Sequence, residues 1–176
     1  MPFLSSERLT MRRILAQTNI LAVGEGQAEL QLLLHLKRLY LPRNCGTTVK
    51  LAGGYGKGGK GVVDYAERYV DRREYTRVVL LLDTDAHWDD RQRKRAVGLQ
   101  LEVVESVPCL ESWLLALHGD QRERNTDAHK REFQRRFGVP AHDARCYADN
   151  FSRQVLDAAR QRVAPLRELL RLFDVA

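Results

Sequence analysis

One short stretch constrains the fold of this chain more than any other: the unbroken apolar run from Val78 to Leu82, within residues 76–82 (TRVVLLL). A strand with one face in water alternates polar and apolar residues, whereas a strand covered on both faces reads as a continuous apolar run. The run therefore predicts a central strand of a parallel sheet, with helices on both faces. It ends directly in Asp83-Thr84-Asp85.

The same order of strand and helix recurs on both sides of this run. The expected strands are 19–23, 47–51, 76–82 and 101–104, and the expected helices are 27–40, 62–70 and, opened by Pro108, 109–118. The polar stretch 87–96 fits either a helix or a loop. This alternation predicts an α/β fold in which helices sandwich a mostly parallel sheet.

Only helices are expected after Asn125. Their apolar positions centre on Phe133, on Leu156 and on residues 166–173. Because no linker or internal repeat interrupts the 176 residues, we expect a single domain, with an α/β core over 19–119 and a helical tail over 120–176 packed on it.

Charge and cysteine content bear on where the chain works. No stretch reaches the roughly 20 apolar residues of a membrane span, and the first 17 residues lack the apolar core of a signal peptide. Cys45, Cys109 and Cys146 are widely spaced, which predicts reduced thiols and a cytoplasmic protein without membrane contact. The net charge of +6 favours a nucleic-acid partner. A solvated surface of mixed charge explains the same residues equally well.

Asp83 and Asp85 are the first candidates for chemistry. Two carboxylates two residues apart on an extended backbone point the same way, and they repel each other unless a cation lies between them. A hard cation, Mg²⁺ or Mn²⁺, suits such a pair. The alternative is a solvated turn in which Asp83 caps the next segment.

Glu25 is the second candidate, because it lies between two glycines directly after the first strand. The glycines allow the backbone to approach a ligand closely, and the following helix favours a negative charge at its start. If the first and third strands are neighbours, Glu25 and the aspartates share one crevice. Helix capping is the alternative role. Glu29, one turn later, either supports that loop from behind or is an exposed helical residue.

The glycine-rich segment 53–61 (GGYGKGGKG) has the G-x-x-x-x-G-K spacing of a phosphate-binding loop between Gly54 and Lys60. Gly61 stands where that motif requires Ser or Thr to reach magnesium, so we expect a glycine loop at the rim of the crevice instead. Lys57 and Lys60 would then bind a phosphate backbone, or else remain solvated.

Three segments together resemble the RloB-like family: residues 24–29 (GEGQAE) before a leucine-rich helix, residues 80–85 (LLLDTD), and residues 106–118 (SVPCLESWLLALH). Members of this family are similar to the Toprim domains of topoisomerases, primases and OLD-type nucleases. The likeness covers about residues 19–118.

The resemblance implies a Toprim-like domain in which Glu25 is the general acid or base and Asp83 with Asp85 binds magnesium. Glu111 matches an acidic residue of the late helix and is, like Glu25 itself, a further candidate ligand of the metal. His118, on roughly the same helical face, either supports the site from behind or is a buried structural histidine. The implied reaction is cleavage or transfer at a phosphodiester, in prokaryotic defence.

Two other functions stay open. The chain is small, so it could be a non-catalytic nucleic-acid-binding or assembly subunit of a larger defence complex. More weakly, the glycine-rich segment could serve a nucleotide-binding enzyme. The choice between DNA and RNA, the number of metal ions and the oligomeric state stay open as well.

Overall fold

The computed structural model describes residues 18–53, 57–70, 74–85 and 87–173, and within them four strands form one sheet. All four run parallel, in the order β2-β1-β3-β4. They are β1 (Thr18–Gly24), β2 (Thr47–Gly53), β3 (Arg77–Asp83) and β4 (Glu102–Ser106). The continuous apolar run of β3 thus lies between β1 and β4, inside the sheet, as its sequence predicts.

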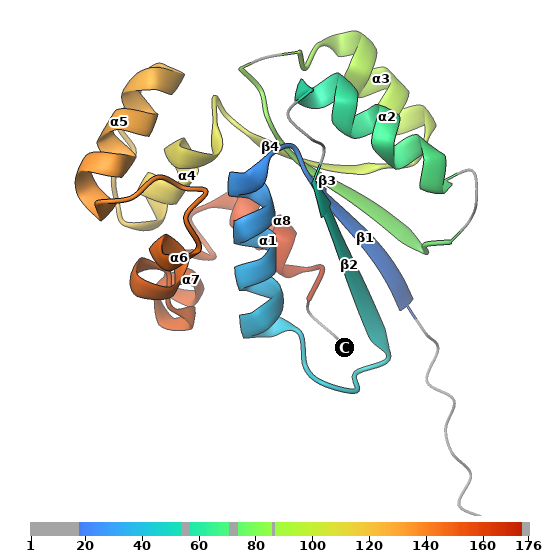
Figure 1. Cartoon of the computed structure of the whole chain (residues 1–176), viewed down its shortest axis with the longest axis horizontal. Helices are drawn as coiled ribbons and strands as arrows, with labels where there is room; N and C mark the ends of the chain where they lie inside the picture. The colour runs from blue at the N-terminus through green and yellow to red at the C-terminus, as the bar shows by residue number, and fades with distance from the viewer. Residues whose placement is uncertain (1–17, 54–56, 71–73, 86, 174–176) are drawn as a thin grey trace, which may run out of the picture.

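Helices cover both faces of this sheet (Figure 1). Along β1, Ile20 and Ala22 pack with α1 and the helical tail, whereas Leu21 and Val23 pack with α2 and α3. The α/β class with a parallel sheet between helices is therefore confirmed, and it is consistent with a Rossmann-like fold. No described helix is long and apolar enough to cross a membrane. The helices are α1 (Gln27–Tyr40), α2 (Gly58–Val70), α3 (Asp90–Gly98), α4 (Leu110–Leu117), α5 (Thr126–Phe137), α6 (Ala144–Asn150), α7 (Arg153–Ala159) and α8 (Ala164–Leu170).

The tail packs on the face of the sheet that α1 covers. Its aromatic side chains Phe133, Tyr147 and Phe151 are buried in the same apolar core as α1 and β1. The Tyr147 hydroxyl also donates a hydrogen bond to the backbone oxygen of Ala28, over 3.1 Å. The first turn of α1 is thereby tied to α6.

One open alternative is settled by the structure, and two local features differ from the sequence-based expectations. The polar stretch after β3 does form a helix, α3, because the Asp89 side chain caps its first turn. Helix α6 was not expected, since Cys146 and Tyr147 are its only buried residues and give no helical period. Pro108 precedes α4 by two residues, and Cys109 is the residue that caps it.

The absence of a side chain at Gly24 allows α1 to approach the end of β1 closely. A Cβ atom at this position would lie 2.8 Å from the Glu29 Cβ atom and 2.9 Å from the backbone nitrogen of Leu30. Because backbone cannot move aside as a flexible side chain can, we expect Gly24→Ala to lower the free energy of unfolding by about 1–3 kcal/mol. Urea denaturation measures this difference.

Gly98→Ala is the matched control, because a Cβ atom there meets nothing within 4 Å. Alanine also favours helix over glycine, so this variant should be as stable as the wild type or slightly more so. Equal stability of the two variants would show that α1 can shift freely against β1.

Candidate active site

The candidate site begins where β1 and β3 end side by side. The two strands are parallel neighbours, with Gly24 opposite Leu81, so the condition under which Glu25 and Asp83 share one crevice is met. The backbone N–H of Glu25 donates to the oxygen of Leu81 over 2.9 Å. One Glu25 carboxylate oxygen accepts from the backbone N–H of Asp83, also over 2.9 Å. Glu25 and Asp83 therefore lie next to each other at the carboxyl edge of the sheet.

Helix α4 adds a third carboxylate from the far side of β3. The Asp83 side chain accepts a hydrogen bond from the backbone N–H of Leu110, the first residue of α4, over 2.8 Å. The backbone N–H of Thr84 is bonded to the oxygens of Ser106 and Pro108. These bonds fix the start of α4 against the end of β3, and Glu111, the next residue of α4, is buried there.

Glu29 supplies a fourth carboxylate. It is only 5% exposed, and its side chain accepts from the backbone N–H of Gly26 over 2.8 Å, which closes the first turn of α1. Sequence reasoning left it between a residue behind the site and an exposed helical residue. It is not exposed, and it lines the same cavity as Glu25 and Asp83.

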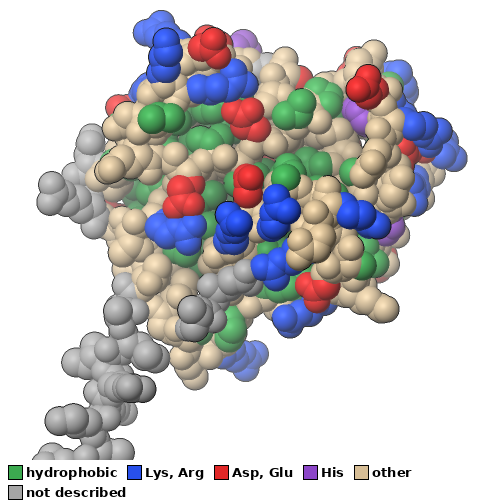
Figure 2. Space-filling view, turned by 180° about the vertical axis from the view of Figure 1, so that it is seen from behind, with side chains coloured by type: hydrophobic (Ala, Val, Ile, Leu, Met, Phe, Trp, Pro, Cys, Tyr) green, Lys and Arg blue, Asp and Glu red, His purple; other side chains and the backbone are tan. Residues whose placement is uncertain are grey.

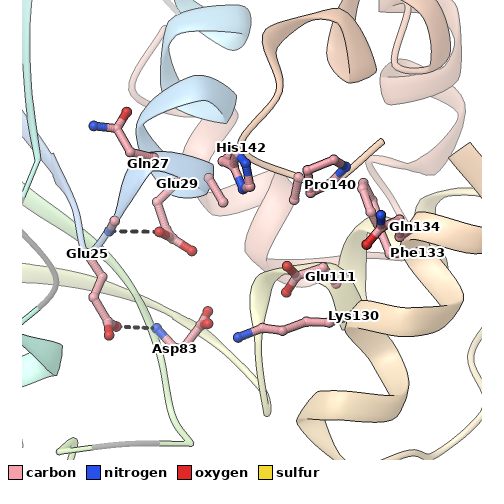
Figure 3. Close-up of a pocket in the computed structure, with 13 residues that line it drawn as sticks. Glu25, Gln27, Glu29, Asp83, Glu111, Lys130, Phe133, Gln134, Pro140 and His142 are labelled. Carbon is pink, nitrogen blue, oxygen red and sulfur yellow. Dashed lines mark hydrogen bonds between the residues drawn. The ribbon is translucent and has the colours of Figure 1, made fainter. Parts of the chain in front are cut away.

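The four carboxylates face a cavity of about 670 Å³ between the sheet edge and the helical tail. Lys130 of α5 also lines it, and in Figure 3 its side chain extends toward Asp83. Sequence reasoning missed Lys130, because it is one basic residue in a tail full of them and only the packing of α5 brings it here. The cavity is lined by Glu25, Gly26, Gln27, Ala28, Glu29, Asp83, Glu111, Lys130, Phe133, Gln134, Pro140, Ala141 and His142.

Burial, together with neighbouring acidic groups, raises the pKa of three carboxyls. Burial, followed by the charges of Glu29 and Glu111, raises the pKa of Asp83 to about 9. Burial also raises the pKa of Glu29 to about 7, and the neighbouring Glu25 and Glu111 add to the effect. The pKa of Glu25 is raised by burial, although its bond from the Asp83 N–H and the charge of Lys130 oppose the shift. The site therefore disfavours the charged form of these carboxyls.

Lys130 is the nearby cation that the packing provides. Burial opposes its charge, but the acidic neighbours Glu111 and Asp83 outweigh that effect and raise the pKa of Lys130. It therefore stays protonated near neutral pH.

Asp85 lies outside the cavity. It is exposed to solvent and does not line the cavity with Asp83. Its charge still contributes to the raised pKa values of Glu25 and Asp83, so it lies at the rim. In the part of the chain that the structure describes, no group of three or more His, Cys, Asp and Glu side chains is arranged to hold a metal ion.

His118 does not reach the cavity. It ends α4, and its ring packs against Phe137 and Phe151 with ring centroids 5.1 Å apart in each case. It borders a different hollow, with Asp120 and Arg136. Burial lowers the pKa of His118, so its place is that of a structural histidine, the second role considered from the sequence.

The two lysines of the glycine-rich segment are not in the cavity either. Lys60 is bonded to Asp64, one helical turn later, over 2.7 Å, and Lys57 is exposed just before α2. Residues 54–56 of this segment lie outside the described residues.

Packing accounts for the next two glycines of the segment. A Cβ atom on Gly58, whose φ is +64°, would lie 2.8 Å from the Cβ atom of His87. A Cβ atom on Gly59 would lie 2.7 Å from the ring of Trp88. The start of α2 therefore needs these glycines in order to pack against the loop after β3. This packing explains the two glycines without a role in phosphate binding.

Comparisons with models of protein families, with curated proteins and with solved structures gave no match. The RloB-like and Toprim-like assignment therefore rests on the sequence motifs alone and is carried forward as a proposal.

The charge of Glu29 makes stability depend on pH in metal-free buffer. Its pKa is raised on folding, so its favourable contribution is complete below about pH 4.5 and is lost as pH rises through about 7. Glu29→Gln keeps a hydrogen-bond acceptor for Gly26 and removes the charge. At pH 8.5 we expect this variant to exceed the wild type in free energy of unfolding by roughly 2–3 kcal/mol, with the gain vanishing near pH 4.5.

Glu123→Gln, at an exposed position outside the cavity, is the control and should not change the pH profile. Urea denaturation series between pH 4.5 and 9 give both curves. A wild type and a Glu29→Gln variant with parallel curves would contradict a buried, crowded Glu29.

Proposed function

We propose that this chain is a magnesium-dependent, Toprim-like enzyme that cleaves or transfers a phosphodiester of nucleic acid in the cytoplasm, in prokaryotic defence. The observation that carries the proposal is the hydrogen-bonded contact of Glu25 with the Asp83 backbone at the ends of two neighbouring strands. In doubly wound sheets, functional sites lie at the carboxyl ends of the strands where the crossovers leave for opposite faces. Here that point lies between β1 and β3.

The donor atoms have the chemistry that a hard divalent cation prefers, although no three of these side chains converge on one point in the described part of the chain. All the acidic groups in the cavity offer carboxylate oxygens, which magnesium prefers, and magnesium binds proteins through as few as one or two carboxylates with water in its other positions. One oxygen of Asp83, Glu25 and Glu29 is engaged by a backbone N–H, so the second oxygen of each can serve a ligand. The raised pKa values of all three add a further reason, since a cation would relieve their repulsion.

The residues divide into roles by position. Asp83 is the central metal ligand, with Glu111 beside it and Asp85 at the rim. Glu25 serves as the general acid or base, because its raised pKa brings it closer to neutrality, where proton transfer is most effective. A bound metal would supply charge neutralisation and an activated water. Lys130 would bind the phosphate oxygens as a fixed positive charge.

The surface charge gives no separate support to a purely electrostatic binding protein. Figure 2 shows the face behind that of Figure 1, where Lys and Arg side chains are interspersed with Asp and Glu. Ion pairs such as Arg77–Glu102 and Arg93–Glu105 neutralise many of the basic groups. The alternative function is that of a non-catalytic nucleic-acid-binding subunit. It would replace the proposed enzyme if metal-dependent cleavage were absent.

Nuclease activity tests the proposed reaction. Cleavage of labelled DNA and RNA should require Mg²⁺ or Mn²⁺ and should fall at least about 100-fold in Asp83→Ala and in Glu25→Gln, because each removes a group in direct contact with the reaction. Asp149→Ala, at an exposed position of α6, is the control and should cleave as the wild type does. Cleavage that survives Asp83→Ala would remove this site from the reaction.

Metal binding can be measured without substrate. A cation that binds only the folded chain stabilises it, by about 2.7 kcal/mol at a hundred times its dissociation constant. We expect Mg²⁺ or Mn²⁺ to raise the melting temperature of the wild type and of Asp149→Ala at pH 8. The shift should be smaller at pH 5, because protons compete for the carboxylates.

Asp83→Ala should lose the metal-induced shift. If its melting temperature rises with metal as much as that of the wild type, the metal binds elsewhere on the chain.

A further inference from the structure

The cavity extends beyond the carboxylates to a wall made by the helical tail. Phe133 and Gln134 of α5 and the segment 140–142 between α5 and α6 line it. Figure 3 shows His142, Pro140 and Gln134 along the side opposite Glu25 and Asp83, with Lys130 below them. A ligand bound at the carboxylates therefore lies beside a second surface, the wall formed by the helical tail.

This wall is held in place by the core. Phe133 is fully buried, and Tyr147 is bonded to the Ala28 oxygen in the first turn of α1. The Nε2 atom of His35, in α1, lies 2.7 Å from the oxygen of Phe151. The tail is thus bonded to the same helix that carries Glu29, and the distance across the cavity is fixed by the fold.

The chemistry of the wall differs from that of the carboxylates. Phe133 and Ala141 are buried behind its surface, and the accessible part of the wall includes the rings of Pro140 and His142. The Gln134 amide and the His142 ring are exposed, and neither makes a hydrogen bond to another group in the described part of the chain. Ring surfaces with a free amide beside them suit a nucleobase, because bases stack on rings and offer donors and acceptors at their edges.

We propose that this pocket binds one unpaired nucleobase next to the reacting phosphate, an inference that rests on the proposed phosphodiester chemistry. The volume of about 670 Å³ is within the range for a small ligand, and α5 lines the cavity with Lys130, Phe133 and Gln134. A base inside a stacked duplex cannot enter such a pocket without leaving the stack. The preferred substrate is therefore a single strand, or a nucleotide turned out of a duplex, and Gln134 contacts the edge of the base.

Three oligonucleotides of one sequence test this substrate class: a single strand, its duplex, and a single strand with one abasic position. With Mg²⁺, the wild type should cleave the single strand at least about 10-fold faster than the duplex. Cleavage at the phosphate beside the abasic position should fall on the order of 10-fold, since stacking of one base contributes about 1–3 kcal/mol. Gln134→Ala and His142→Ala should raise KM and leave kcat nearly unchanged.

Gln154→Ala is the matched control, because Gln154 is an exposed glutamine of α7 that does not line the cavity. Its KM should equal that of the wild type. Duplex and single strand cleaved at equal rates, with no effect of the abasic position, would overturn the base pocket and leave the proposed function standing.

Binding separates the two proposals where no oligonucleotide is cleaved. Fluorescence anisotropy with Mg²⁺ then measures affinity for the same three oligonucleotides. A preference for the intact single strand that Gln134→Ala removes supports the pocket although the proposed reaction has failed. Equal affinity for all three, unchanged by Gln134→Ala, overturns the pocket too.

Discussion

The parallel pairing of β1 with β3 is the constraint on which the rest of the site depends. Because Gly24, the last residue of β1, lies opposite Leu81, β3 runs two residues further and its last residue, Asp83, lies beside Glu25. Glu25, the residue after β1, then bonds to the β3 backbone twice. Its N–H donates to the oxygen of Leu81, and its carboxylate accepts from the N–H of Asp83. A shift of register by one residue would turn every side chain of one strand to the other face. Each of the two strands buries apolar side chains on both faces of the sheet, against different helices. This burial fixes the register of β1 against β3, and the register fixes the position of Glu25 relative to Asp83.

The candidate site contains an arrangement that is unfavourable for folding, a group of buried carboxylates. Burying carboxylates beside one another is unfavourable, and burial together with their mutual repulsion raises the pKa of Asp83 and of Glu29. An ordinary core would place apolar residues there. Hydrogen bonds from the backbone N–H groups of Leu110 and Gly26 offset part of the cost, and Lys130 offsets a further part. Strain of this kind, held by a rigid frame, is characteristic of binding and catalytic sites.

The sequence predicted what depends on local pattern. The continuous apolar run of β3 placed it inside the sheet, and the alternation of strands and helices gave the α/β class. Glu25 and Asp83 could be named because each directly follows a strand. Their adjacency needed the order of the strands, which local pattern does not contain.

Contacts between segments far apart in the sequence could not be predicted, for the same reason. Nothing near Lys130 in the sequence shows that α5 faces the end of β3. His118 has the helical spacing to share a face with Glu111, yet it packs on Phe137 and Phe151 in the tail. Gly58 and Gly59, at the start of α2, resembled part of a phosphate loop because close packing against His87 and Trp88 requires the same residue type. The chemical roles of Glu25, Asp83, Asp85 and Glu111 stay predictions from the motifs.

The helical tail is therefore part of the site rather than an addition to a complete α/β domain. The sheet edge and α1 bring acidic groups together, but they form only one side of the cavity. The tail supplies the other side, with the cation of Lys130 and the polar and ring groups of Gln134 and His142. Because Tyr147 and Phe151 join the tail to α1, forces that hold the tail also set the width of the cavity. Substitutions in the buried contacts between α6 and α1 should therefore act on substrate binding as well as on stability, although they lie outside the cavity.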